Sequence, residues 1–320
     1  MRGLSRTLGV AILGALLSSC MGSGLPSQSG SAPRVAARSP GGNLPVAAPR
    51  MRPDWSMTQG IFVTDQAAGD VRALKHCGNG LICAPTFTFN NGINQPLGAW
   101  SDHHYLYVTN GNATVTEYKP NPVQTFTYST GLNFPQDVVT DRQRHVYVAD
   151  YGCCNTGSIK EYKHNNNNIF AQCSTPFYLG PYGIAIDRSG DVFVSWSDYI
   201  SGHVSEYVGG LSGCNPVTLL TFSFYVYGIA FDSAGNLLIS DYSANAVDIS
   251  PPPYNAASTL ISGIAARNVR INRANDQLLI TDGSKVYVYS YPGAAPLQTL
   301  GSVNGLSSAM TAVDWKNYSQ

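Results

Sequence analysis

Aromatic and acidic side chains recur in this sequence beside short apolar runs, where they could together form a binding surface. The set is Asp137, Asp150, Tyr151, Tyr182, Trp196, Tyr227, Asp241 and Tyr242, together with the basic residue Arg267. Tyrosine and tryptophan rings stack on sugar rings or peptide groups at a low entropy cost, and carboxylates fix hydroxyl groups or amines. This combination is typical of a surface that binds a peptide, a glycan or a partner protein.

A structural role competes with binding for each of these residues. An aspartate at the end of a strand can accept hydrogen bonds from the turn that follows, and a tyrosine that recurs can pack between repeats. We therefore expect the strongest binding contributions from residues that depart from the repeat. These are Asp137, Tyr182, Trp196, Tyr227 and Arg267.

A sequence repeat supplies the elements that position these side chains. Its best-formed copy, Pro181 to Tyr207, contains three apolar runs, with a turn at Asp187 and Gly190 between the first two. The second runs of successive copies are closed by Asp65, Asn110, Asp150, Asp198, Asp241 and Asp282, so the period lies between 40 and 48 residues. Such a period, with several short strands in each copy, indicates the four-stranded blades of a β-propeller.

The two ends of the repeat array complement each other. The first copy lacks its opening strand, because the residues before Ile61 read as linker, whereas Ala309 to Trp315 copies the opening-strand pattern with no second strand after it. We predict an all-β fold, a six-bladed β-propeller of four-stranded antiparallel blades, in which the C-terminal strand completes blade 1 and closes the ring. Closure removes the strand edges through which sheets aggregate.

Four motifs in the copy that ends at Tyr207 are Gly-Ile-Ala-Ile-Asp, Ser-Gly-Asp, Val-Phe-Val and Val-Ser-Glu-Tyr. This pattern resembles NHL-type six-bladed propellers and, more loosely, the gluconolactonase-like and streptogramin-lyase-like proteins. The resemblance covers about residues 58 to 318. It implies a propeller without implying one function, because such blades host binding scaffolds, sensors and enzymes.

The resemblance also provides an alternative from another class, a propeller hydrolase or lyase of the lactonase-like kind. Lactonase-like relatives hold a divalent cation near the central channel with a Glu and with Asn and Asp oxygens. The three glutamates of this chain, Glu117, Glu161 and Glu206, instead share a third-strand position that we expect to be remote from the channel.

Catalytic groups of other kinds are also hard to find in the sequence. Lyase-like relatives rely on a histidine with a carboxylate, and only His203 of the six histidines falls near the expected binding face. A Gly-x-Ser-x-Gly nucleophile motif is missing from the sequence. We therefore predict no catalytic residue, no metal and no cofactor, and we favour a binding or scaffold role over the enzymatic alternative.

The N-terminal residues indicate export. Arg2 and Arg6 precede an apolar run, Leu8 to Leu17, and small residues precede Cys20. This resembles the lipobox of bacterial lipoproteins, which implies cleavage before Cys20 and attachment of lipid to its sulfur. The alternative is an ordinary secretory signal, and the apolar run is shorter than the roughly 20 residues of a membrane-spanning helix.

The expected domain organisation follows from this reading. Residues 1–19 form the signal peptide, residues 20–54 hold the lipidated Cys20 and a flexible linker rich in Gly, Ser, Pro and Ala, and residues 55–320 form the propeller. We expect a lipid-anchored protein of the bacterial cell envelope. Met21 rather than Asp follows the cysteine, which by the same resemblance favours the outer membrane in a host that has one.

The remaining cysteines suit an oxidising compartment. They are Cys77, Cys83, Cys153, Cys154, Cys173 and Cys214, an even number that indicates disulfides. Cys77 and Cys83 flank the Gly-Asn-Gly turn of one hairpin, and we predict that they pair. The connectivity of the other four stays open, because Cys153 and Cys154 could bond to each other or to separate partners such as Cys173.

Charge excludes one class of partner. Lys and Arg together number 19, as do Asp and Glu, so no net field attracts nucleic acid. We expect a monomer that contacts the membrane through its lipid and binds a protein, peptide or glycan.

Overall fold

The computed structural model describes residues 60–76, 81–102, 104–119, 122–152, 157–175, 180–198 and 200–315. The chain divides into two units, Met1–Met51 and Arg52–Gln320, and all described residues belong to the second. The described residues begin at Gly60, so the expected signal peptide, Cys20 and the whole linker lie outside them. Within the described part, no helix has the length and apolar character needed to cross a membrane.

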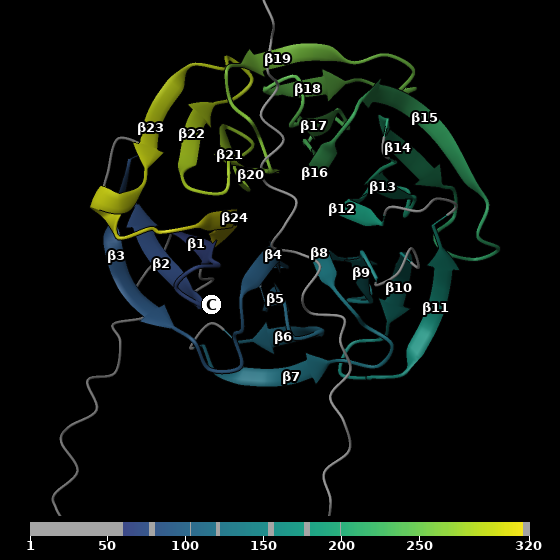
Figure 1. The fold of residues 1–320 in the computed structure, drawn as a ribbon, viewed down its shortest axis with the longest axis horizontal. Coiled ribbons are helices and arrows are strands. Elements are labelled where there is room, and N and C mark those ends of the chain that lie inside the picture. Colours follow the sequence, from purple (N-terminus) through teal and green to yellow (C-terminus); the bar gives the residue numbers. More distant parts are fainter. Residues whose placement is uncertain are drawn as a thin grey trace, which may run out of the picture. The chain divides into compact units, whose positions relative to one another are not determined.

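Six four-stranded antiparallel sheets surround a central axis, as Figure 1 shows. Blades 1 to 3 are formed by β24 (Ala309–Trp315), β1 (Gly60–Asp65), β2 (Asp70–His76) and β3 (Ile82–Phe89); by β4 (Pro96–Ser101), β5 (Leu106–Asn110), β6 (Thr114–Tyr118) and β7 (Gln124–Tyr128); and by β8 (Pro135–Thr140), β9 (Val146–Asp150), β10 (Ser158–Tyr162) and β11 (Ile169–Ser174). Each blade begins with its innermost strand.

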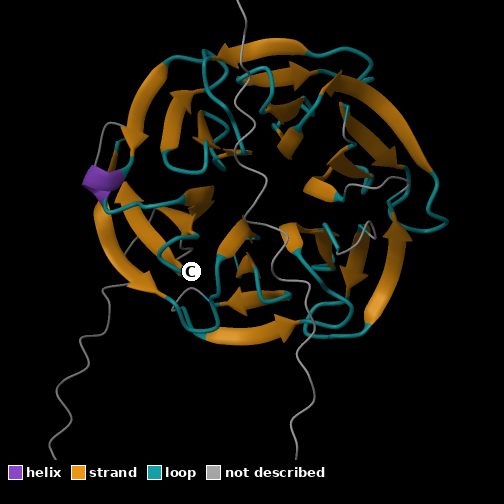
Figure 2. Ribbon diagram, viewed as in Figure 1, coloured by secondary structure: helices purple, strands orange, loops and turns teal. Residues whose placement is uncertain are grey.

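The other three blades follow the same order. Blades 4 to 6 are formed by β12 (Pro181–Ile186), β13 (Val192–Ser197), β14 (Ser201–Tyr207) and β15 (Pro216–Ser223); by β16 (Val226–Phe231), β17 (Leu237–Asp241), β18 (Ala246–Ser250) and β19 (Ser258–Ser262); and by β20 (Asn268–Ile271), β21 (Gln277–Thr281), β22 (Val286–Ser290) and β23 (Pro296–Leu300). Among the described residues the only helix is a short 3-10 turn, η1 (Ser302–Asn304) (Figure 2). The all-β prediction is confirmed.

The ring is closed by the C-terminal strand, as the sequence predicted. β24 pairs antiparallel with β1, with Val63 opposite Ala312. The Thr64 side chain reinforces the junction, because its Oγ1 accepts a hydrogen bond from the Thr311 amide at 2.9 Å and donates to the Leu97 carbonyl of blade 2 at 2.8 Å. Each innermost strand contacts the innermost strands of both neighbouring blades, so the ring is continuous.

The aspartates that end the first strands act as turn caps. In blade 4 the Asp187 carboxylate accepts hydrogen bonds from the amides of Ser189, Gly190 and Asp191 at 2.8 to 2.9 Å. Gly190 has a φ of 93°, which a side chain would strain. The repeated aspartate and glycine therefore build the hairpin.

The hydrophobic core lies between adjacent blades. One cluster joins Val139 and Ala149 of blade 3 to Ile184 and Val194 of blade 4, and all four side chains are buried. Because every blade packs against two others, the apolar faces are covered only when the ring is complete.

A disulfide joins two neighbouring blades. Cys173 on β11 of blade 3 is bonded to Cys214 in the connection between β14 and β15 of blade 4, with a Cα–Cα distance of 5.3 Å. Cys83 is also disulfide-bonded. Its predicted partner, Cys77, lies outside the described residues, as do Cys153 and Cys154. The Cys77–Cys83 pair therefore stays a prediction.

Candidate binding face

The predicted aromatic residues converge at one end of the ring. Because neighbouring strands are antiparallel, each first strand begins at the end of the ring where the second strand finishes. Tyr182 and Tyr227 lie near the starts of β12 and β16, and Tyr151 and Tyr242 directly follow β9 and β17. Arg267 precedes β20 at the same end. Five of the nine predicted binding residues thus share one face.

Four of these residues form a continuous row of rings, which we call the tyrosine ladder. Ring centroids are 5.4 Å apart for Tyr151 and Tyr182, 4.7 Å for Tyr182 and Tyr227, and 5.2 Å for Tyr227 and Tyr242. The Arg267 guanidinium lies 5.7 Å from the Tyr242 ring. The ladder rings are half-buried and cross blades 3 to 5, and the exposed Arg267 extends the row to blade 6.

Two further aromatic residues extend the ladder. Phe134 lies 6.4 Å from Tyr151, and Tyr225 is stacked 6.0 Å from Tyr227. Neither was chosen as a binding candidate from the sequence, although Tyr225 falls among the first-strand entries that we expected at this face. Both belong to the segments that enter first strands, Phe134 before Pro135 and Tyr225 before Val226, and this shared position is the signal that could have found them.

The hydroxyl groups of Tyr182 and Tyr227 are neutral at physiological pH. Burial raises the pKa of Tyr227 to about 12, and the positive charge of Arg267 opposes that rise. Burial and the neighbouring phenols of Tyr151 and Tyr227 raise the pKa of Tyr182 further. The face therefore presents neutral phenol groups, which donate and accept hydrogen bonds, beside one permanent positive charge.

Asp150 holds in place a backbone segment of the binding face. Its carboxylate is buried, lies 2.6 Å from the Lys160 Nζ, and accepts hydrogen bonds from the amides of Asn133 and Phe134 at 3.1 and 2.7 Å. These contacts hold the segment that carries Phe134. Its predicted ligand contact is not tested, and the structure shows a positioning role.

Asp241 has a similar place in blade 5. It is buried, and its carboxylate accepts a hydrogen bond from the Ala244 amide at 2.9 Å in the turn that follows Tyr242. Burial raises the pKa of this carboxyl group. The turn cap fixes the backbone that carries Tyr242, while a direct ligand contact by Asp241 stays a prediction.

Trp196 differs from our expectation of an open ring on the face. Its side chain is 2% exposed and is stacked on His203 with ring centroids 4.0 Å apart. The indole N–H donates to Ser205 Oγ at 2.9 Å. Trp196 lies opposite Pro181, as Asp150 lies opposite Pro135 in blade 3, so a ring within blade 4 replaces a carboxylate. We place Trp196 inside the blade, and its binding role stays untested.

The turn after Trp196 is capped by a different carboxylate. Asp198 accepts hydrogen bonds from the amides of Ile200 and Ser201 at 2.7 and 2.5 Å. Its Oδ2 also lies 3.6 Å from Nε2 of His203. His203 is thus held between Trp196 and Asp198.

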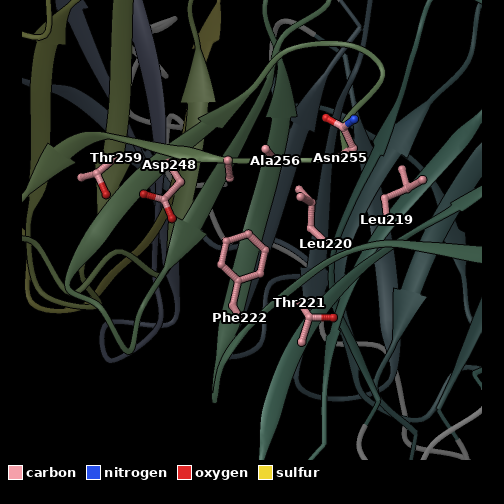
Figure 3. Close-up of a pocket in the computed structure, with 9 residues that line it drawn as sticks. Leu219, Leu220, Thr221, Phe222, Asp248, Asn255, Ala256 and Thr259 are labelled. Atoms are coloured by element: carbon pink, nitrogen blue, oxygen red, sulfur yellow. The ribbon is translucent and has the colours of Figure 1, made fainter.

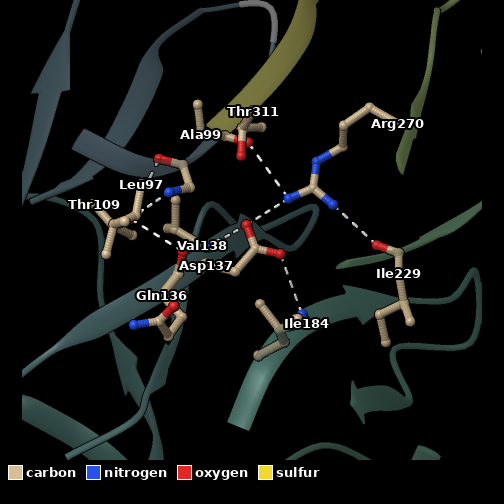
Figure 4. A network of polar contacts seen from close by, with 12 residues as sticks. Leu97, Ala99, Thr109, Gln136, Asp137, Val138, Ile184, Ile229, Arg270 and Thr311 are labelled. Atoms are coloured by element: carbon tan, nitrogen blue, oxygen red, sulfur yellow. Dashed lines mark hydrogen bonds and ion pairs between the residues drawn. The ribbon is translucent and has the colours of Figure 1, made fainter. Parts of the chain in front are cut away.

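Asp137 on β8 and Arg270 on β20, both innermost strands, meet in a network of polar contacts (Figure 4). Arg270 Nη2 lies 2.5 Å from Asp137 Oδ1, and the two side chains are 3% and 1% exposed. Arg270 Nη1 also donates to the Ile229 carbonyl at 2.9 Å, and the Ile184 amide donates to Asp137 Oδ2 at 3.3 Å. The sequence predicts Asp137 as a ligand contact, a role that is not tested, and the structure places it in a buried ion pair.

The ion pair crosses the ring. Asp137 belongs to blade 3 and Arg270 to blade 6, which lie opposite each other, and a longer contact of 3.5 Å joins Arg270 Nη2 to the Ala99 carbonyl of blade 2. Together with Ile184 and Ile229, the network links blades 2 to 6. Burial raises the pKa of Asp137, and the Arg270 guanidinium acts against that rise.

The third-strand glutamates lie away from the channel, on β6, β10 and β14. Glu161 is 2.7 Å from His145 Nδ1, and Glu117 is 3.3 Å from His164 Nε2. Within the described ranges, no group of three His, Cys, Asp or Glu side chains is arranged to hold a metal ion.

Comparisons with known proteins give structural likenesses only. No protein-family model matches the sequence, and no curated protein matches it. A chain in the crystal structure of a nidogen/laminin complex is similar with a TM-score of 0.67 and 13% identity, over 81% of this chain and 99% of that one. A protein of unknown function from Bacteroides caccae gives a TM-score of 0.62 and 10% identity over the same shares.

A streptogramin B lyase structure is also similar, with a TM-score of 0.48 and 12% identity, over 62% of this chain and 66% of that one. At these identities a likeness speaks for the fold and not for the reaction or the ligand. Together with the ring described above, the likenesses to the first two structures identify this chain as a six-bladed β-propeller.

Proposed function

We propose that this protein is a membrane-anchored, extracytoplasmic binding protein that holds a peptide, glycan or protein partner on the tyrosine ladder and Arg267. The observation that carries the proposal is the unbroken contact of four half-buried rings across three blades. Aromatic rings that already pack against each other lose little entropy when a ligand covers them.

The charge at the end of the ladder narrows the class of ligand that would fit. Arg267 is exposed beside Tyr242, and a guanidinium pairs well with a carboxylate or a sulfate. The rings suit the flat face of a sugar or a peptide group. A ligand that combines such a face with an acidic group fits both parts of the surface.

The surrounding structure favours a rigid surface. The Asp137–Arg270 network lies between the same inner strands whose ends carry Tyr182 and Tyr227, and it ties those strands together. A chain of similar fold in a nidogen/laminin complex supports a protein partner as one use of this architecture.

Binding to peptide and glycan arrays, and co-purification from the cell envelope, would test the proposal. The double variant Tyr182→Ala/Tyr227→Ala should weaken binding of the captured ligand at least about tenfold, because central aromatic contacts dominate such surfaces. The matched control is Tyr289→Ala, which removes a half-buried ring from β22. Equal binding by the double variant and the wild-type protein would overturn the proposed face.

A charge variant separates the contribution of Arg267. Arg267→Ala should weaken binding of an acidic ligand and make the remaining binding less dependent on salt. Arg188→Ala removes the same charge from the exposed hairpin between β12 and β13, at the other end of the ring, and should leave binding unchanged. Equal effects of the two substitutions would show that only net charge matters.

The membrane anchor has its own test. Cys20→Ala removes the sulfur that a lipid would use, so the variant should move from the membrane fraction to the soluble fraction. Fractionation of cells that express each form measures this directly. Recovery of the variant entirely in the membrane fraction would contradict lipid anchoring.

A further inference from the structure

A pocket lies between the outer parts of blades 4 and 5 (Figure 3). This pocket has a volume of about 390 Å³, within the range of small-molecule sites. β15 contributes the apolar side chains Leu219, Leu220 and Phe222, and the β18–β19 loop contributes Ala256 and Ala257. None of the tyrosine-ladder residues lines it.

Asp248 on β18 gives the pocket its chemistry. Its side chain is 7% exposed, and among the described residues its Oδ1 atom has no hydrogen-bond partner. Thr259, its cross-strand neighbour on β19, bonds to the carboxyl group. A buried carboxylate oxygen without a donor is costly, so this position favours a ligand that brings an N–H group and a positive charge.

The electrostatics of the pocket point to the same kind of ligand. Asp248 is the one charged side chain among the described residues that line it. Burial raises the pKa of Asp248, and the nearby Asp241 adds to the rise. A cation in the pocket would offset both effects, whereas an anion would strengthen them.

The wall of the pocket is already fixed. Ser250 Oγ donates to the Ala256 carbonyl at 2.7 Å, and Tyr254 OH donates to the Gly235 carbonyl at 3.0 Å. The Tyr254 ring also packs against Phe193 and Phe231, with centroids 5.1 and 5.9 Å away. Little ordering of the β18–β19 loop would therefore accompany binding.

We propose that this pocket binds a primary ammonium group carried on an apolar body. Asp248 is the counter-ion and accepts the N–H hydrogen bond, and Leu219, Leu220 and Phe222 contact the apolar part. A quaternary ammonium group carries the same charge but has no N–H to donate, so the site should discriminate against it.

Titration with three related probes tests the proposal. Phenethylammonium should shift the methyl NMR signals of Leu219 and Leu220 in a saturable way. Phenethyl alcohol, which has no charge, and phenethyltrimethylammonium, which has no N–H, should bind at least about tenfold more weakly. Equal binding of the alcohol would indicate a neutral Asp248 and overturn the proposal. Equal binding of the quaternary probe would overturn the hydrogen bond.

Variants locate the effect on the carboxylate. Asp248→Asn should reduce phenethylammonium affinity at least about tenfold, whereas Asp276→Asn, which changes an exposed carboxylate in blade 6, should leave it unchanged. If Asp248→Asn fails to fold, Leu219→Ala offers a second test, because it shortens a partly exposed wall residue and should weaken binding about threefold or more. Absence of any saturable shift in the wild-type protein would also overturn the proposal.

Discussion

Two arginines three residues apart enter blade 6 and have opposite surroundings. Arg267 is exposed and lies over the Tyr242 ring, whereas Arg270 is buried and bonded across the channel to Asp137. The charge of Arg267 is available to a ligand, whereas the charge of Arg270 is balanced by the Asp137 carboxylate. The difference shows that residue type and departure from the repeat do not by themselves identify a binding residue.

Blade 4 shows the same difference between two aromatic residues. Tyr182 and Trp196 both depart from the repeat, and both were predicted as ligand contacts. Tyr182 lies in the ladder near the start of β12, whereas Trp196 is buried inside the blade, where it contacts His203 and Ser205. A residue that departs from a repeat can therefore fill the interior of a blade as well as form part of a binding surface.

The largest effect should come from a change that disrupts the exposed tyrosine ladder and the buried Asp137–Arg270 pair together. Deletion of Ala309 to Gln320 removes β24, so blade 1 loses its innermost strand and the inner strands lose their closed arrangement. We expect the cooperative unfolding transition to disappear in thermal and denaturant melts followed by circular dichroism. An unchanged melting curve would contradict the closed ring.

The next largest effect should separate the two arginines. Arg270→Met leaves the Asp137 carboxylate buried without its partner, which should lower the free energy of unfolding by about 3 to 5 kcal/mol. Arg267→Met should change it by less than about 0.5 kcal/mol, because its side chain is exposed. Urea denaturation measures both values.

A double variant sharpens that comparison. Arg270→Met combined with Asp137→Leu removes both charges, so it should recover much of the stability lost in Arg270→Met. A double variant as unstable as the single one would show that the ion pair is not the source of the loss. Similar losses of unfolding free energy for the Arg267 and Arg270 substitutions would contradict the difference between an exposed and a buried arginine.

A small effect should also come from Tyr182→Phe. This change keeps the ring and removes one hydroxyl group from the partly exposed ladder, so the free energy of unfolding should fall by less than about 1 kcal/mol. Trp196→Ala, which empties a buried position, should cost about 3 kcal/mol or more. Thermal melts of the two variants compare them, and a larger loss for Tyr182→Phe would reverse our placement of these residues.

Much of the fold could be predicted from the sequence because it depends on local signals. Asp187 and Gly190 specify a hairpin within a few residues, and the regular spacing of such turns specifies the number of blades. The closing strand Ala309–Trp315 could also be identified, since it copies a pattern seen five times before it.

The site was predicted less completely because its contacts join distant residues. Asp137 and Arg270 are separated by 133 positions, and no local pattern in either segment indicates the partner. Asp150 likewise was predicted as a strand end and a ligand contact without its ion-pair partner, although Lys160 is only ten residues away on the next strand. Sequence spacing indicated which end of the ring a residue occupies, but not whether its side chain turns outward or inward.

The pairing of β1 with β24 sets the order in which the protein can fold. The Thr64–Thr311 contact spans 247 positions, whereas the pairs within blades 2 to 6 join strands that follow each other along the chain. Local pairs form early, and a contact of such long range forms only after the intervening chain is present. The ring therefore stays open until the last strand has been delivered, so a chain that crosses a membrane from its N-terminus would complete its fold only on the far side.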